Sequence, residues 1–227
     1  MRQYSVLWVV ATGMEARALG VSDILPEGFY PDVPAEGHAV LVSGVGMLAT
    51  AVSLTKVLAG QSVGLIVNFG VCGSFRSDLA PGTVVQVVDD ELGDFGAEDH
   101  GNFLSAFDLG FVSKEDPRYI NHRLRSLTPV NFHLQLPEVT GVTLNTVHGS
   151  SDSIRLFKVR CVADVETMEG AAVFFVAAEF KLPVIQLRAV SNFVEPRNRD
   201  GWKMKEALDA LEQVISELQK KITTHYS

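Results

Sequence analysis

Six short apolar runs, separated by segments with helical spacing, constrain the fold of this chain more than any other feature of its sequence. Most of the runs are continuous stretches of Val, Ile and Leu that do not alternate with polar residues. Strands of that kind are buried on both faces, as in an α/β sheet that helices cover on both sides. The expected strands are residues 6–11, 39–43, 65–69, 83–88, 159–162 and 184–190.

Helices are expected between and after these strands. Residues 48–58, 169–180 and 203–221 space their apolar side chains as an amphipathic helix does, and they are rich in helix formers. Residues 91–140 differ, because they are mixed in charge and weakly periodic. We expect an irregular excursion there, with one helix near residues 117–127.

The composition favours a soluble protein that acts on a small molecule. The 227 residues are 47% hydrophobic and 20% charged, which is enough apolar material for one core, so residues 1–227 are expected to form a single domain. A net charge of −8 leaves no basic stripe for nucleic acid. No apolar run reaches the ~20 residues that span a bilayer, so no membrane partner is expected.

The expected location is the cytoplasm. The apolar run at residues 4–11 resembles the core of a signal peptide, but residues 12–19 indicate a turn into a helix, so a first core strand is the better interpretation. The two cysteines, Cys72 and Cys161, are too few for a disulfide framework and lack metal-site spacing. This cysteine usage indicates a reducing compartment.

Residues 44–49 (GVGMLA) match the G-x-G-x-x-A pattern of a dinucleotide site. That site also needs an Asp or Glu about twenty residues further on, at the end of the next strand. Here the next expected strand ends in Asn68 and Phe69. We therefore favour the simpler interpretation, in which Gly44 and Gly46 let the backbone turn sharply and approach a ligand or another loop.

Two further patterns have plainer explanations than catalysis. Cys72 lies in a second glycine turn at a strand end, residues 70–74, and no His, Lys or Arg nearby in sequence would activate it, so a buried structural thiol is favoured over a nucleophile. The acidic residues between Asp89 and His100 match no ligand spacing, and we expect a solvated loop there instead of a metal site.

Polar residues gather where the expected strands end. Glu15 follows the first strand and Asn192 the last. Ligands bind beyond the carboxyl ends of the strands in open α/β sheets, so these side chains are expected to line one site. Glu169 belongs with them, because apolar residues surround it and a carboxylate in such company needs a polar partner, such as a pair of sugar hydroxyls. The helix dipole explains Asp164 and Glu166 without catalysis.

Four segments carry a family resemblance: VSGVGM (42–47), NFGVCG (68–73), VETMEGAA (165–172) and RAVSN (188–192). In this order and spacing they resemble the nucleoside phosphorylase and methylthioadenosine/S-adenosylhomocysteine nucleosidase superfamily. The resemblance implies a three-layer α/β/α fold with a central, mostly parallel mixed sheet, no cofactor, and a homo-oligomer. Residues 191–199 are most similar to a branch that hydrolyses a nucleoside of hypoxanthine.

The resemblance also implies a role for each polar residue. Met168 packs on the ribose, Glu169 accepts hydrogen bonds from the ribose hydroxyls, and Glu15 activates the attacking water. Asn192 stands where adenine-type nucleosidases carry an Asp that protonates purine N7. An amide cannot give up that proton, but it can hold N7 and O6 of a 6-oxopurine as negative charge develops. Further substrate contacts are implied at Gly46, Gly70, Val71, Ser153 and Ile154.

Three alternatives stay open. A methylthioadenosine/S-adenosylhomocysteine nucleosidase would act on an adenine nucleoside with a similar site. A purine nucleoside phosphorylase would replace water with phosphate, and that branch carries Arg-x-Gly-Ser/Thr-x-Gly after the third strand, where Asn68 and Val71 occupy the anion-holding positions here. A nucleoside-binding sensor without turnover would keep Glu169 but would have no need for Glu15.

Overall fold

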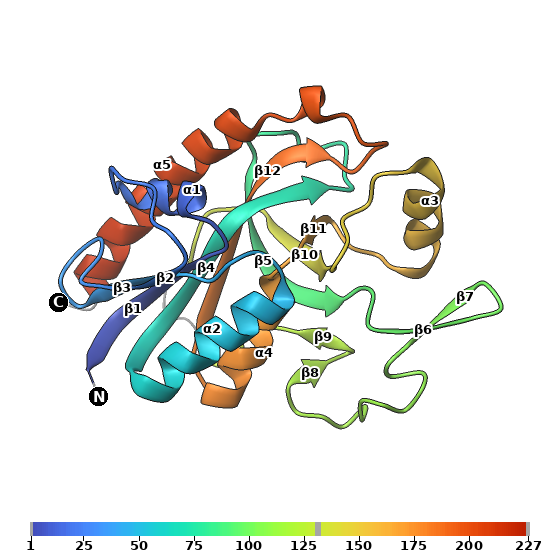
Figure 1. Cartoon of the computed structure of the whole chain (residues 1–227), viewed down its shortest axis with the longest axis horizontal. Coiled ribbons are helices and arrows are strands. Elements are labelled where there is room, and N and C mark those ends of the chain that lie inside the picture. The colour runs from blue at the N-terminus through green and yellow to red at the C-terminus, as the bar shows by residue number, and fades with distance from the viewer. Residues whose placement is uncertain (1, 130–132, 226–227) are drawn as a thin grey trace.

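A mixed sheet of ten strands organises the chain, which the computed structural model describes over residues 2–129 and 133–225 (Figure 1). The strands of this sheet are β1 Gln3–Val10, β2 Gly28–Pro31, β3 His38–Val42, β4 Ser62–Ser74, β5 Val84–Leu92, β8 Tyr119–Ile120, β9 Arg123–Leu124, β10 Glu138–Thr143, β11 Val165–Thr167 and β12 Val184–Phe193. Two more, β6 Gly96–Asp99 and β7 Asn102–Ser105, form a separate antiparallel ribbon. The helices are α1 Gly13–Ala16, α2 Met47–Gly60, α3 Ser151–Arg160, α4 Gly170–Phe180 and α5 Met204–His225, with 3-10 turns η1 Arg17–Leu19 and η2 Arg199–Gly201.

The sheet is open at one side and closed on itself at the other. Strand β1 pairs in parallel with β3 and β4, and β4 pairs in parallel with β12. Beyond β4 the order continues through β11, β10 and β5, while β12 pairs with both β4 and β5. The strands β4, β11, β10, β5 and β12 therefore form a closed ring. The sequence predicted a mixed sheet flanked by helices, and that architecture is confirmed, but the closure was not foreseen.

Helices cover both faces of the sheet because the inner strands are apolar on both sides. Along β1, Trp8 belongs to the hydrophobic cluster of α5, and Leu7 to the cluster of α2 and α4. Both side chains are completely buried. Figure 1 shows α5 on one side of this part of the sheet and α2 with α4 on the other. The helices expected at residues 48–58, 169–180 and 203–221 are α2, α4 and α5, and these three are confirmed.

The strand expected at residues 159–162 is wrong, because residues 151–160 form α3. Ser150 caps this helix with a capping box that includes Ser153. The helix buries Ile154 and Phe157, three residues apart, and leaves Val159 83% exposed. The apolar run therefore lies partly on the outer face of a helix, and the strand that precedes α4 is the three-residue β11.

The irregular excursion after residue 91 is only partly confirmed. Strand β5 continues to Leu92, and β10 begins at Glu138. The helix expected near residues 117–127 is wrong, because β8 and β9 form a hairpin there. Asn121 and His122 connect the two strands with φ values of 52° and 66°, a turn geometry that no α-helix contains.

The acidic residues at the end of β5 are not part of a solvated loop, contrary to expectation. Asp89 is buried and pairs with Arg123 at 2.9 Å and Arg125 at 3.1 Å. Asp90 is completely buried and accepts hydrogen bonds from Thr143 Oγ1 and Gln186 Nε2. Over residues 2–129 and 133–225, no three His, Cys, Asp or Glu side chains lie together as metal ligands would. In the same part of the chain, no helix combines the length and apolar character that crossing a bilayer requires.

The buried carboxyl of Asp90 should make stability depend on pH. Burial raises its pKa from 3.8 to about 6, so the unfolded chain ionises first and the free energy of unfolding falls as pH rises from about 4 to 6. One such group is worth about 2–3 kcal/mol. Urea unfolding of Asp90→Asn should lack this decline, whereas Asp99→Asn, in the exposed ribbon, should keep it. Equal pH dependence in the parent and Asp90→Asn would contradict the assignment.

Candidate active site

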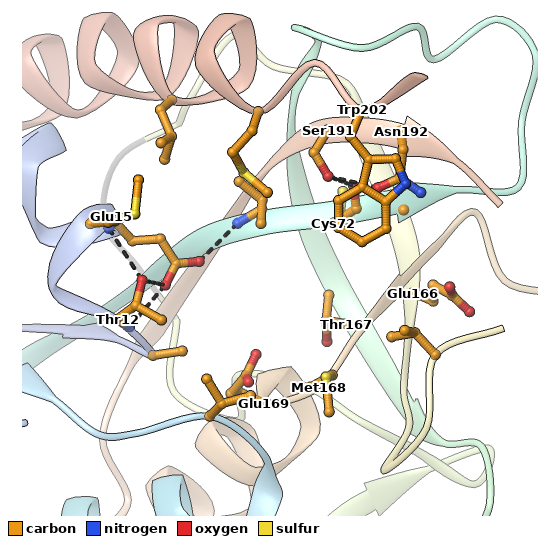
Figure 2. A pocket seen from close by; sticks show the side chains of 18 of the residues that line it. Thr12, Glu15, Cys72, Glu166, Thr167, Met168, Glu169, Ser191, Asn192 and Trp202 are labelled. Atoms are coloured by element: carbon orange, nitrogen blue, oxygen red, sulfur yellow. Dashed lines mark hydrogen bonds between the residues drawn. The ribbon is translucent and has the colours of Figure 1, made fainter. Parts of the chain in front are cut away.

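A cavity of about 340 Å³ lies where β1, β4 and β12 approach their carboxyl ends (Figure 2). A cavity of this size suits a small ligand such as a nucleoside. Glu15 and Glu169 lie toward one end of it, and Asn192, Glu166 and Trp202 toward the other. The lining residues are Ala11, Thr12, Met14, Glu15, Val45, Val71, Cys72, Gly73, Val147, His148, Glu166, Thr167, Met168, Glu169, Ser191, Asn192, Trp202, Met204 and Leu208.

Glu15 is held by the first turn of α1, directly after β1. Thr12 caps the helix: its Oγ1 accepts a hydrogen bond from Glu15 N, while Glu15 Oε2 accepts hydrogen bonds from Thr12 N at 3.0 Å and Thr12 Oγ1 at 2.9 Å. The other carboxylate oxygen, Oε1, accepts a hydrogen bond from Val71 N at 3.2 Å. This capping box fixes the side chain against β4 and at the edge of the cavity.

Burial raises the pKa of Glu15, and its neighbours modify the shift in both directions. The hydrogen bond from Thr12 lowers the pKa, the negative charge of Glu169 raises it, and the positive charge of Arg188 lowers it. A Cβ atom at Gly70 would lie 2.5 Å from Glu15 Oε1 and 3.6 Å from Arg188 Nη1, so the absence of a side chain there lets the two charges approach. A carboxylate with a raised pKa, exposed to a cavity, is suited to accept a proton.

Arg188 is buried in the protein interior and does not line the cavity. It is 1% exposed, on β12, and its Nη2 donates to Asn68 Oδ1. Asn68 in turn donates from Nδ2 to Val9 O at 2.9 Å. Among the described residues that line the cavity, none is Lys or Arg. The cavity therefore offers no permanent cation to hold a phosphate ion.

Glu169 is the N-terminal cap residue of α4, and its Oε1 accepts a hydrogen bond from Gly46 N at 2.8 Å. Gly46, with φ of 95°, is itself the cap residue of α2. The glycine motif of residues 44–49 thus brings a backbone N–H to a carboxylate. Met168, beside Glu169, lines the same cavity. Glu169 keeps its second oxygen available for a ligand, because the structure shows a bond to Oε1 alone over the described residues.

Asn192 reaches the cavity through an irregularity in β12. The register between β12 and β4 shifts between Val190 and Asn192, as in a β-bulge, which re-aims a side chain. Asn192 Oδ1 accepts a hydrogen bond from Ser191 Oγ at 2.8 Å, and its Nδ2 donates to Phe193 O at 2.9 Å. An amide so placed offers both a donor and an acceptor to a ligand.

Several sequence-based expectations need correction at the site. Residues 70–74 continue β4 and do not form a turn. Cys72 is buried as expected, and burial raises its pKa to about 12. Ser153 and Ile154 do not line the cavity, because Ser153 caps α3 and Ile154 packs against the protein interior.

The sequence reasoning missed a pair of side chains at the far end of the cavity. His148 Nδ1 lies 2.7 Å from Glu166 Oε2. Glu166, attributed to a helix dipole, lies on β11 and is 4% exposed. His148 lies between Val147 and Gly149 in the loop before α3, where no periodic pattern or sequence motif marks it.

Comparisons with known proteins identify the family and the fold. The chain belongs to the phosphorylase superfamily, whose model matches residues 33–224. It is 34% identical to a futalosine hydrolase of Streptomyces coelicolor over 195 residues, which are 81% of this chain and 79% of that protein. A mutant futalosine hydrolase of Helicobacter pylori has a similar structure, with a TM-score of 0.75, 20% identity and coverage of 96% of this chain and 99% of the other. The 5'-methylthioadenosine/S-adenosylhomocysteine nucleosidase of Helicobacter pylori follows with a TM-score of 0.74, 19% identity and the same coverage.

Proposed function

We propose that this chain is a nucleosidase that hydrolyses the N-glycosidic bond of a 6-oxopurine nucleoside, with futalosine as its substrate and hypoxanthine as the released base. The observation that carries the proposal is the buried Glu15 carboxylate, which shares one cavity with Glu169 and Asn192. The similarity to curated futalosine hydrolases supports the choice of substrate. Futalosine belongs to menaquinone biosynthesis, which is therefore the proposed pathway.

Each of the three residues answers one requirement of the reaction. Breaking the bond builds positive charge on the sugar and negative charge on the base, and a nucleophile must reach C1′. Glu169 binds the ribose hydroxyls, with Met168 packed on the sugar. Glu15 takes the proton of the attacking water, for which its raised pKa is suited. Asn192 holds N7 and O6 of the base.

The alternatives fit the cavity less well. A phosphorylase needs a cation or a cluster of donors for phosphate, and the described lining contains no Lys or Arg. A sensor would bind the nucleoside without needing a carboxylate of raised pKa beside the sugar. An adenine-specific nucleosidase would need an acid for N7, whereas the residue at position 192 is an amide.

The substrate carboxylate also needs a partner in the protein. Futalosine carries a benzoate, and Arg155, Arg197 and Arg199 are the candidate partners for its carboxylate. Arg197 is favoured, because its guanidinium lies 5.5 Å from the ring of Trp202, which lines the cavity. We further propose that residues 1–227 act as one nucleosidase domain, without a cofactor, in a cytoplasmic homo-oligomer.

The reaction class can be tested by offering futalosine, inosine and methylthioadenosine, each with and without phosphate. We expect base release from futalosine without phosphate, with free ribose derivative as the second product. Added phosphate should change neither the rate nor the product, because the described lining contains no Lys or Arg to hold it. A requirement for phosphate, with formation of a ribose 1-phosphate, would contradict the hydrolase assignment.

Replacing the proposed catalytic base, Glu15, should reduce turnover without reducing substrate binding. Glu15→Gln should lower kcat by at least ~10²-fold and leave nucleoside binding nearly unchanged, because the amide cannot accept the proton of water. In the parent, kcat should fall as pH is lowered through the raised pKa of Glu15, because only the ionised form is a base. Isothermal titration and kinetics over pH check both points. Near-normal turnover in Glu15→Gln would favour a sensor.

Asn192 should set the choice of base. The parent should prefer futalosine to methylthioadenosine, because the Asn192 amide can hold N7 and O6 of hypoxanthine but cannot give adenine the proton that an Asp at this position would supply. Asn192→Asp should move the ratio of kcat/KM toward the adenine nucleoside by roughly ten- to a hundredfold, since one buried hydrogen bond is worth ~1–3 kcal/mol. Asn102→Asp, on the exposed ribbon of β6 and β7, is the matched control. An unchanged ratio in Asn192→Asp would show that this residue does not select the base.

A further inference from the structure

A His–Glu pair at the base end of the cavity has no role in the reaction as described so far. His148 Nδ1 lies 2.7 Å from Glu166 Oε2, and the two side chains are only 10% and 4% exposed. The backbone N of His148 also donates to Glu166 Oε2, at 3.4 Å. Both residues line the cavity. A carboxylate on Nδ1 fixes the ring orientation and leaves Nε2 as the nitrogen free to face a ligand.

Gly73 places this pair beside Asn192. A Cβ atom at Gly73 would lie 3.3 Å from Glu166 Cγ and 3.4 Å from Asn192 Nδ2. The two side chains therefore approach the same point, beside Gly73, from β11 and β12, and Val194 Cγ2 lies at 3.0 Å from that point. Figure 2 shows Glu166 and Asn192 on the same side of the cavity, away from Glu15. A purine held by Asn192 would lie against the His148–Glu166 pair.

We infer that His148, held by Glu166, is the general acid that protonates the departing purine. This inference rests on the proposed function. His148 supplies the proton that the amide of Asn192 cannot give. Glu15 takes a proton from water as the water oxygen bonds to C1′. The C1′–N9 bond breaks, its electron pair passes to the purine, and a ring nitrogen of the purine takes the Nε2 proton of His148. Solvent then carries the proton from Glu15 back to His148.

The surroundings of the imidazole contain charges of both signs. The carboxylate of Glu166 stabilises the protonated ring directly. His148 packs against Phe75 and Phe157, and a cation lies over each of these rings: Lys158 Nζ at 5.7 Å from the first and Arg160 Cζ at 4.9 Å from the second. Both cations lie beyond the phenyl rings, whereas the Glu166 carboxylate contacts the imidazole directly at Nδ1.

The test compares two substrates that differ in their need for an acid. Hypoxanthine leaves a nucleoside more easily when it is protonated, whereas nitrophenolate leaves p-nitrophenyl β-D-ribofuranoside without a proton. His148→Gln should lower kcat/KM for futalosine by ~10²-fold or more and change it little for the nitrophenyl riboside. The variant should also lose the decline of futalosine hydrolysis at high pH. His100→Gln, at an exposed ribbon residue, is the matched control.

Glu166→Gln keeps the imidazole and provides a second measurement if His148→Gln is poorly folded. It removes the negative charge, so the alkaline decline of kcat/KM for futalosine should move to lower pH. Equal losses on both substrates in His148→Gln, or no loss on either, would overturn the inference, as would an unmoved alkaline decline in Glu166→Gln. Failure of the parent on every nucleoside offered would instead overturn the proposed function, and this inference with it.

Discussion

Burying the carboxylate of Glu15 is the constraint on which the site depends. A buried carboxylate without partners costs several kcal/mol, so hydrogen bonds and a positive charge must replace the water that it loses. Thr12 provides two donors from the end of β1, and Val71 a third from β4. Arg188, opposite Gly70 in the register of β4 and β12, provides the positive charge. Three strands must therefore keep one register, and position 70 must lack a side chain, before the Glu15 carboxylate can be held at the cavity.

A second buried network holds the backbone turn that carries Glu169. The backbone N of Gly170 donates to Thr167 Oγ1, which lies 3.1 Å from Thr143 Oγ1, and Thr143 donates to the completely buried Asp90. A Cβ atom at Gly170 would lie 2.3 Å from Asp90 Oδ2. The first turn of α4 is thus tied to β5, β10 and β11, and Glu169 caps that turn. A connected polar network of this kind orders the backbone turn that carries Glu169.

The sequence was most informative where a local pattern and a local structure coincide. Continuous apolar runs marked the strands covered on both faces, and Glu15 and Asn192 stood out because polar residues follow buried strands. Where structure depends on distant pairing, the patterns failed. Strand β11 has three residues, too few for a periodicity, and the ring that it closes is set by contacts with β4 and β10. His148 escaped notice for the same reason, since only that closure brings its loop to Glu166.

The choice between water and phosphate in such a fold comes down to where positive charge is placed. Phosphate needs donors that face the cavity, and here the guanidinium of Arg188 faces Asn68 and lies under Gly70, where it is 1% exposed. Its charge still acts on the site, because it lowers the pKa of Glu15 against the effect of burial. An arginine on the cavity wall would attract an anion, whereas Arg188 acts on the Glu15 carboxyl from behind the wall. With that positive charge buried, the described lining presents the carboxylates of Glu15 and Glu169 to the cavity, and these would repel an anion such as phosphate.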